Sequence, residues 1–297
     1  MARTDKSLAR RLKDGVPDGV AQSIRNGTVR WGAMTARARM QPDFLVVGAQ
    51  RAGTTTLYRM LVEHPSIVRP SFQKGIGYFD LNYGRGADWY QGHFPVRSFA
   101  EWRTRKSGEP MTFESSGYYL FHPLAAERIA RELPATKVIV LVRDPVERAF
   151  SAHAHEFARG FETLGFEEAM DREEERTSGE AARLVADPGY VSYNHRHYSY
   201  RARGRYAEQI IRYHAALGTD RVMILDAHTF FADPNASFQE LLDFLGLRAW
   251  TSTQTGVHNA RPREDMPASL RRRLETSFEA DDEALAALLG REPSWRT

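Results

Sequence analysis

The stretch 44–63 constrains the fold of this chain more than any other. It begins with the apolar run 44–47, which has the length of a buried strand, and continues with a loop bounded by Gly48 and Gly53. Apolar residues at helical spacing follow between 57 and 61. A loop at this place presents backbone N–H groups and the positive end of a helix dipole to an anion. The sequence therefore predicts a phosphate-binding loop at the end of a strand.

The loop differs from an ATP-binding P-loop at one decisive position. Thr54 follows Gly53 where the pattern GxxxxGK[ST] requires lysine, and the cation lies inside the loop at Arg51. A kinase needs that lysine on the β- and γ-phosphates and a carboxylate for Mg²⁺. We therefore expect a phosphate cradle without the machinery for an ATP γ-phosphate, and a small-molecule kinase is the least favoured alternative.

A second strand is predicted at 138–142, and polar residues follow it directly. Arg143 leaves the strand, and Asp144 and Pro145 have the residue types of a helix cap and a first helical turn. Ser151 lies about two turns along that helix. In open α/β sheets ligands bind at the carboxyl ends of strands, and an arginine with a hydroxyl suits a phosphate. We expect Arg143 and Ser151 to bind a second phosphate.

The remaining patterns alternate between strand and helix. They predict an α/β fold that is P-loop-like and three-layered, with a mainly parallel sheet and helices on both faces. Strands are expected within 111–121 and at 222–225, and helices at 123–133, 204–217, 238–245, 267–279 and 281–289. The charged segment 160–192 is expected to form solvent-exposed helix. Residues 1–41 are interpreted as a basic surface arm, and 42–297 as one domain.

Composition excludes several classes of protein. The chain has no cysteine, which rules out disulfides, thiolate zinc sites and thiol catalysis. No apolar run reaches the roughly 18 residues that span a bilayer, and no signal-peptide core is visible. The net charge of +3 comes without a block of cations interleaved with aromatics, so nucleic-acid binding is not expected.

The loop motif Gln50-Arg51-Ala52-Gly53-Thr54-Thr55 resembles the 5′-phosphosulfate loop of sulfotransferases that use 3′-phosphoadenosine 5′-phosphosulfate (PAPS). The closest likeness is to the carbohydrate type that includes the heparan sulfate sulfotransferases. The RDPxxRxxS pattern at 143–151 is similar to that family's 3′-phosphate signature. The resemblance implies donor contacts from Arg51, Ala52, Gly53, Thr54, Thr55, Thr56, Arg143, Ser151 and, in a late basic loop, Arg261.

The resemblance also implies a reaction. A sulfuryl group would pass from PAPS to a hydroxyl or amine of a carbohydrate, a glycolipid or a small metabolite, without a metal. The animal enzymes are usually anchored in the Golgi and carry a late disulfide loop. This chain has neither feature, so we expect a soluble, cytoplasmic, bacterial protein.

The chain departs from the family at its catalytic residues. Arg51 stands where the family usually has lysine; it keeps the charge but does not readily give up a proton. The glutamate that serves as general base in the heparan sulfate enzymes falls on Gly75. Three substitutes are available: Glu114, which we favour slightly, His155, and His153, which we favour least because it lies off the helix face of Ser151 and His155. A nucleotide-binding protein without turnover is therefore an alternative.

The acceptor site is expected along two aromatic and basic segments. These segments are 72–94 and 190–206. The residues expected to bind the acceptor are Lys74, Tyr78 and His153.

Overall fold

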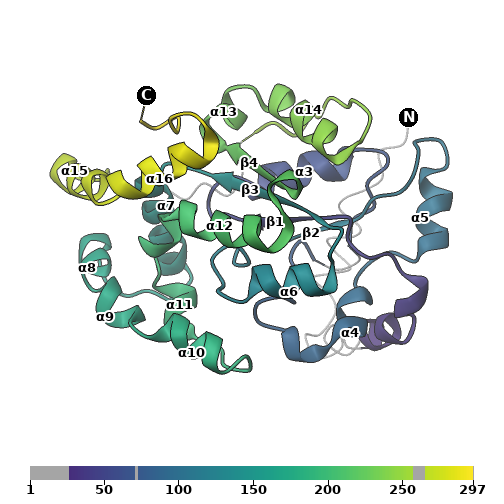
Figure 1. Ribbon diagram of the computed structural model, residues 1–297, viewed down its shortest axis with the longest axis horizontal. Helices are drawn as coiled ribbons and strands as arrows, with labels where there is room; N and C mark the ends of the chain where they lie inside the picture. The colour runs from purple at the N-terminus through teal and green to yellow at the C-terminus, as the bar shows by residue number, and fades with distance from the viewer. Residues whose placement is uncertain (1–26, 71–72, 257–264, 297) are drawn as a thin grey trace, which may run out of the picture.

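Four parallel strands form one sheet in the order β2-β1-β3-β4 (Figure 1). The computed structural model describes residues 27–70, 73–256 and 265–296. The strands are β1 (Phe44–Gly48), β2 (Phe113–Ser115), β3 (Lys137–Val142) and β4 (Val222–Asp226). The chain runs from β1 outward to β2 and then to β3 on the other side of β1, so the strand order reverses between β1 and β3. Such a switch point opens a crevice at the carboxyl ends of the two strands.

Helices cover both faces of the sheet, which confirms the predicted α/β fold. α3, α13 and α14 lie on one face, and α6 and α12 lie on the other (Figure 1). The helices are α3 (Thr54–Glu63), α4 (Ala87–Gln91), α5 (Arg97–Thr104), α6 (Ala125–Glu132), α7 (Pro145–Ala158), α8 (Phe166–Asp171), α9 (Glu173–Thr177), α10 (Glu180–Ala186), α11 (Tyr193–His197), α12 (Tyr206–Leu217), α13 (Ala227–Ala232), α14 (Pro234–Leu245), α15 (Ala268–Ser277) and α16 (Glu279–Leu289). Short 3₁₀ turns are η1 (Ala36–Ala38), η2 (Tyr83–Arg85), η3 (Ala202–Gly204) and η4 (Thr219–Arg221).

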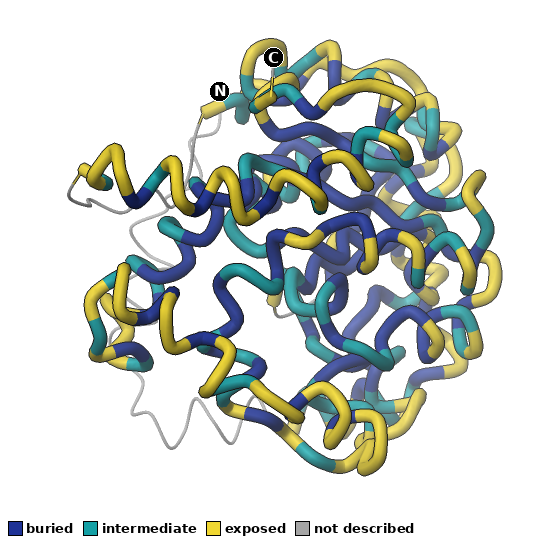
Figure 2. Tube along the Cα trace, turned by 60° about the vertical axis from the view of Figure 1, so that its left-hand side comes forward, coloured by how far each residue is buried: buried dark blue, intermediate teal, exposed yellow. Residues whose placement is uncertain are grey.

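The core lies between the sheet and these two helical layers. β1 is buried along its whole length, and Phe44 stacks on Phe113 of β2 with ring centroids 5.0 Å apart. In Figure 2 the buried trace runs through the interior and the exposed trace forms the rim. Uncharged, β-branched strands of this kind are stable only when both faces are covered. The core therefore fixes the positions at which β1 and β3 end.

The predicted cap of α7 is confirmed, and the end of α14 is also capped. Asp144 caps α7, because its carboxylate accepts hydrogen bonds from the backbone N–H groups of Val146 (2.8 Å) and Glu147 (3.3 Å). Gly246 ends α14 in the left-handed conformation, with φ 77°. Both caps occupy the positions that their residue types favour.

The prediction of a solvent-exposed helix over 160–192 is wrong in part. The segment forms three short helices, and some of its charged side chains point inward. Glu173 is buried and accepts hydrogen bonds from the backbone N–H groups of Arg201 (2.6 Å) and Ala202 (2.9 Å). The charge pattern alone could not reveal this, because the partners lie almost thirty residues later in the chain.

The described part of the basic arm packs against the domain. The Met40 N–H donates to the Pro95 carbonyl at 2.9 Å, and the Arg39 guanidinium donates to the Phe94 carbonyl at 2.6 Å. Residues 1–26 lie outside the described residues. Within the described part of the chain, no helix combines the length and the apolar character needed to cross a bilayer.

Candidate active site

Two residues of the loop between β1 and α3 have positive φ angles, which favour glycine. Gly53 adopts φ 107°, and a Cβ there would lie 2.9 Å from the Phe231 ring. Arg51 also has a positive φ, 75°. The Ala49 N–H donates to the Leu141 carbonyl at 2.7 Å, which ties the loop to β3. The loop thus holds the N-terminus of α3, where N–H groups lack intrahelical acceptors, at the switch point of the sheet.

The two phosphate motifs meet at this loop. The Arg51 Nε donates to the Ser151 hydroxyl at 3.1 Å, across 100 residues of sequence. The Arg143 guanidinium donates to the Arg51 carbonyl at 3.1 Å and lies 3.5 Å from the Glu147 carboxylate. The structure therefore brings Arg51, Arg143 and Ser151 together at the tips of β1 and β3.

Lys74, which the sequence placed at the acceptor, contacts the start of α3 beside the loop. Its Nζ donates to the hydroxyls of Thr54 (3.0 Å) and Thr55 (3.3 Å), at the start of α3. Burial lowers the pKa of the Lys74 ammonium to about 8. A second cation therefore faces the phosphate loop, and it titrates within reach of neutral pH.

Glu114, which the sequence offered as a general base, is held inside the cleft wall by hydrogen bonds. It is fully buried, and Oε1 accepts hydrogen bonds from the Ile76 and Gly77 N–H groups at 2.6 and 3.0 Å. The hydroxyls of three residues complete its shell: Ser116 (2.5 Å), Tyr119 (2.9 Å) and Tyr90 (2.8 Å). Four of these five donors bond Oε1 and one bonds Oε2, so the carboxylate is anchored in the cleft wall.

Two of the residues expected to bind the acceptor are buried. Tyr78 is buried and stacks on Tyr90 with ring centroids 4.6 Å apart. His153 is buried, and its Nε2 lies 2.8 Å from the Leu164 carbonyl. His155 is half-buried on α7, one residue before Glu156. Arg261 lies outside the described residues.

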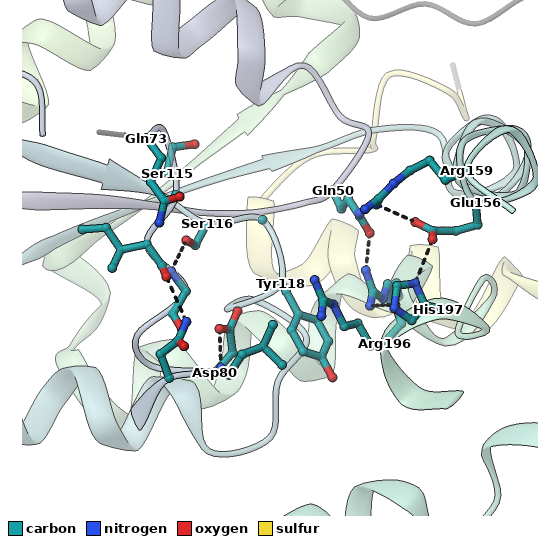
Figure 3. Close-up of a pocket in the computed structure, with 17 residues that line it drawn as sticks. Gln50, Gln73, Asp80, Ser115, Ser116, Tyr118, Glu156, Arg159, Arg196 and His197 are labelled. Atoms are coloured by element: carbon teal, nitrogen blue, oxygen red, sulfur yellow. Dashed lines mark hydrogen bonds and ion pairs between the residues drawn. The ribbon is translucent and has the colours of Figure 1, made fainter. Parts of the chain in front are cut away.

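A cleft of about 420 Å³ adjoins the phosphate loop (Figure 3). Gln50 forms one border next to Arg51, and Gln73 and Gly75, which flank Lys74, form another. The other lining residues are Ile76, Gly77, Asp80, Leu81, Asn82, Ser115, Ser116, Gly117, Tyr118, Glu156, Arg159, Arg196, His197 and Arg203. The lining is mostly polar, so the cleft suits a hydrophilic acceptor with several hydrogen-bonding groups.

The position of the family's glutamate is closed in this chain. A Cβ added to Gly75 would lie 2.7 Å from the Ser115 carbonyl and 2.8 Å from the Ser116 hydroxyl. Real Cβ atoms do not approach backbone oxygen so closely, so a side chain there would displace β2. The departure at Gly75 is therefore built into the packing of the cleft wall.

The cleft contains titratable groups that the sequence interpretation missed. Burial raises the pKa of the Asp80 carboxyl to about 7, and the nearby Glu114 charge adds to the effect. The His197 Nδ1 lies 2.8 Å from the Glu156 carboxylate. Burial alone would raise the pKa of Glu156, but His197, His155 and Arg159 outweigh it and the net pKa is lowered. The only sequence signal for His197 was its place in 190–206, a segment rich in tyrosine, histidine and arginine.

Arg203 joins the two sides of the site. It is buried, donates to the Gln50 side-chain carbonyl and to the Arg196 backbone carbonyl (2.6 Å), and lies 4.8 Å above the Tyr118 ring. Burial lowers the pKa of Arg203 to about 10, which leaves it charged at neutral pH. Arg203 therefore fixes Gln50, the residue that separates the phosphate loop from the cleft.

Comparison with known proteins agrees with this geometry. The family model described as the sulfotransferase domain matches residues 41–261. The chain belongs to the sulfotransferase family. This confirms the resemblance that the two phosphate motifs carry.

Relatives of the family cover much of the chain. Bifunctional heparan sulfate N-deacetylase/N-sulfotransferase 4 of Mus musculus is 31% identical over 216 residues, which are 69% of this chain and 22% of that protein. Membrane-associated sulfotransferase kil1 of Dictyostelium discoideum is 25% identical over 321 residues, covering 86% of this chain and 66% of that protein. The crystal structure of a sulfotransferase from Alicyclobacillus acidocaldarius is 29% identical, with a TM-score of 0.65, and covers 87% of this chain and 100% of that one.

Proposed function

We propose that this sulfotransferase transfers a sulfuryl group from PAPS to a hydroxyl or amine of a polar acceptor. The observation that carries the proposal is the contact of 3.1 Å between Arg51 Nε and the Ser151 hydroxyl. It joins two anion-binding motifs at neighbouring strand tips, and PAPS has an anionic group at each end of one adenosine.

The residues at the switch point fit this donor. The loop N–H groups from Arg51 to Thr56 and the α3 dipole suit the 5′-phosphosulfate. Arg143 and Ser151 suit the 3′-phosphate, since Arg143 already reaches the loop carbonyl of Arg51. Only glycine suits position 53 of this loop, because its φ is 107° and a Cβ there would collide with Phe231.

Charge neutralisation at the leaving phosphate is divided between two residues. PAPS supplies an activated sulfuryl group, whose transfer leaves negative charge on the 5′-phosphate. Arg51 stays protonated and offsets that charge electrostatically. Lys74 faces the same loop through Thr54 and Thr55, and its lowered pKa permits it to give a proton to the leaving phosphate.

The acceptor occupies the cleft beside the loop. Its lining offers amide, hydroxyl, carboxylate and guanidinium groups, which match the hydroxyls and charged groups of a carbohydrate. The heparan sulfate relatives carry N-sulfotransferase in their names, so an amino sugar is the first acceptor to try. A hydroxyl of a glycan or glycolipid is the second.

A transfer assay with ³⁵S-labelled PAPS tests the proposal. The acceptor panel contains N-deacetylated heparosan, neutral oligosaccharides, glycolipids and phenols, and binding of adenosine 3′,5′-bisphosphate is measured in parallel by calorimetry. We expect label to appear in at least one acceptor. Binding of the bisphosphate with neither transfer nor donor hydrolysis would overturn the proposal and indicate a nucleotide-binding protein.

A further inference from the structure

We infer that His197, held by Glu156, is the general base that removes the proton from the acceptor. The inference deepens the proposed sulfuryl transfer and rests on it. It assigns a catalytic role to a pair of side chains that neither phosphate motif contains, at the end of the cleft that borders the phosphate loop.

The hydrogen bond between the two side chains determines which ring nitrogen is available. The Glu156 carboxylate is ionised at neutral pH, because its net pKa is lowered, and it can only accept. His197 Nδ1 therefore carries the hydrogen in the 2.8 Å contact with Glu156 Oε2. Nε2 of the neutral ring then holds a lone pair, and no hydrogen-bond partner for Nε2 occurs among the described residues.

The pair lies on the donor side of the cleft. Glu156 belongs to α7, the helix that also supplies Ser151, and His197 ends α11. In Figure 3 Gln50, Glu156, Arg159 and His197 form one group, and Tyr118 separates them from Asp80. Gln50 is covalently next to Arg51 of the phosphate loop, so this group borders the place where the sulfuryl group is expected.

Aromatic residues pack against the His197 ring, and cationic groups lie near the Glu156 carboxylate. The ring of His197 packs between Phe161 and Tyr193, with centroid distances of 4.4 and 4.5 Å. Other charged or titratable groups around the pair include His155 and Arg159 on α7, Arg196 on α11, Arg203 on η3, and Tyr200. Arg159 lies 4.0 Å from Glu156 Oε1, which leaves Oε2 for His197.

Other candidate bases are less well placed. Gly75 has no side chain and no space for one, and Glu114 is fully buried and accepts five hydrogen bonds from the cleft wall. Asp80 lines the cleft, but it lies beyond Tyr118 in Figure 3 and accepts the Leu81 N–H at 2.5 Å. The histidine with a carboxylate behind it has the geometry by which enzymes orient a base.

The step balances within the proposed reaction. The acceptor oxygen or nitrogen forms a bond to sulfur, and its proton passes to His197 Nε2. The bond between sulfur and the bridging phosphate oxygen breaks, and the electron pair leaves with adenosine 3′,5′-bisphosphate. Glu156 stabilises the imidazolium through Nδ1–H until the proton returns to water.

The test compares His197→Gln with wild type, using the first acceptor that takes label from PAPS and, in parallel, donor hydrolysis by water. We expect kcat to fall about 10²- to 10⁴-fold, the range for loss of a general base, while the affinity for adenosine 3′,5′-bisphosphate stays within about twofold. In His197→Ala, added imidazole should restore part of the rate. Glu156→Gln should lower kcat by a smaller factor, since it removes only the orienting carboxylate.

The controls separate this inference from the proposed function. His228→Gln makes the same change at an exposed histidine on α13 and should leave kcat unchanged. Full activity of His197→Gln would overturn the inference while leaving sulfuryl transfer intact. The same conclusion would follow if Asp80→Asn or His155→Gln, and not His197→Gln, showed the large loss of kcat. Absence of transfer and hydrolysis in wild type would overturn both.

Discussion

Glu114 and Asp80 are both buried carboxylates, but they differ in their hydrogen-bond partners. Glu114 receives five hydrogen bonds and anchors the segment that contains Ile76 and Gly77. Asp80 lines the cleft, and its pKa is raised to about 7 because burial penalises the charge. At the scale of single residues, hydrogen-bond partners decide whether an acid supports the fold or remains available to a ligand.

Glu114→Gln should destabilise the protein. The side-chain NH₂ group of glutamine would face N–H and O–H groups that now donate to the Glu114 carboxylate. At least one of these buried donors would lose its partner, at a cost of about 1–3 kcal/mol. Thermal unfolding followed by circular dichroism should show a lower Tm. Glu127→Gln, an exposed change on α6, is the matched control. An unchanged Tm together with a large loss of kcat would return Glu114 to the role of base.

The charge of Lys74 should make donor affinity depend on pH. In the free protein Lys74 loses its proton as pH rises through about 8, and the anionic donor binds the protonated form better. The affinity for adenosine 3′,5′-bisphosphate should therefore be highest below about pH 7 and decline above about pH 8. In Lys74→Arg the charge persists, so the decline should disappear. The same decline in both proteins, measured by calorimetry, would assign it to another group.

At the scale of elements, the sequence predicts the proposed donor side residue by residue, and the cleft beside it only as the two segments 72–94 and 190–206. The phosphate loop and the Arg143 motif each lie within one strand-loop-helix segment, so local pattern reveals them. The cleft wall combines side chains from five separate segments, 50, 73–82, 115–118, 156–159 and 196–203. No local pattern distinguishes His197, which faces the cleft, from His195, which is buried against Tyr118 with 2.7 Å between Nδ1 and the hydroxyl. Their orientations follow from packing between distant elements.

The contact between the 73–77 segment and β2 gives a prediction at this scale. Gly75→Ala should lower the free energy of unfolding by about 1–3 kcal/mol, because its Cβ would lie 2.7 Å from the Ser115 carbonyl. Gly84→Ala is the control, since a Cβ there meets nothing within 4 Å. Denaturant unfolding of the two variants measures the difference. Equal stability would mean that the wall has room for a side chain at Gly75.

At the scale of the whole molecule, the proposed donor would contact elements from distant parts of the chain. The loop after β1, the segment after β3 and Lys74 all face the same crevice. C-terminal α15 reinforces this edge, because Arg271 lies 3.8 Å from the Asp144 carboxylate at the start of α7. A ligand that binds only the folded state stabilises the whole cooperative unit. Donor binding should therefore appear as a change in global stability.

Adenosine 3′,5′-bisphosphate at about 100 times its Kd should stabilise the fold by about 2.7 kcal/mol, which raises Tm by roughly 5 °C or more for a chain of this size. Arg143→Ala should remove most of this shift, since a charged hydrogen bond contributes about 1.5–3 kcal/mol to binding. Arg131→Ala, an exposed arginine on α6, should keep it. ATP with Mg²⁺ should give a smaller shift, because Thr54 replaces the P-loop lysine. A larger shift with ATP and Mg²⁺ than with the bisphosphate would favour a kinase, because the loop would then be recognising the β- and γ-phosphates.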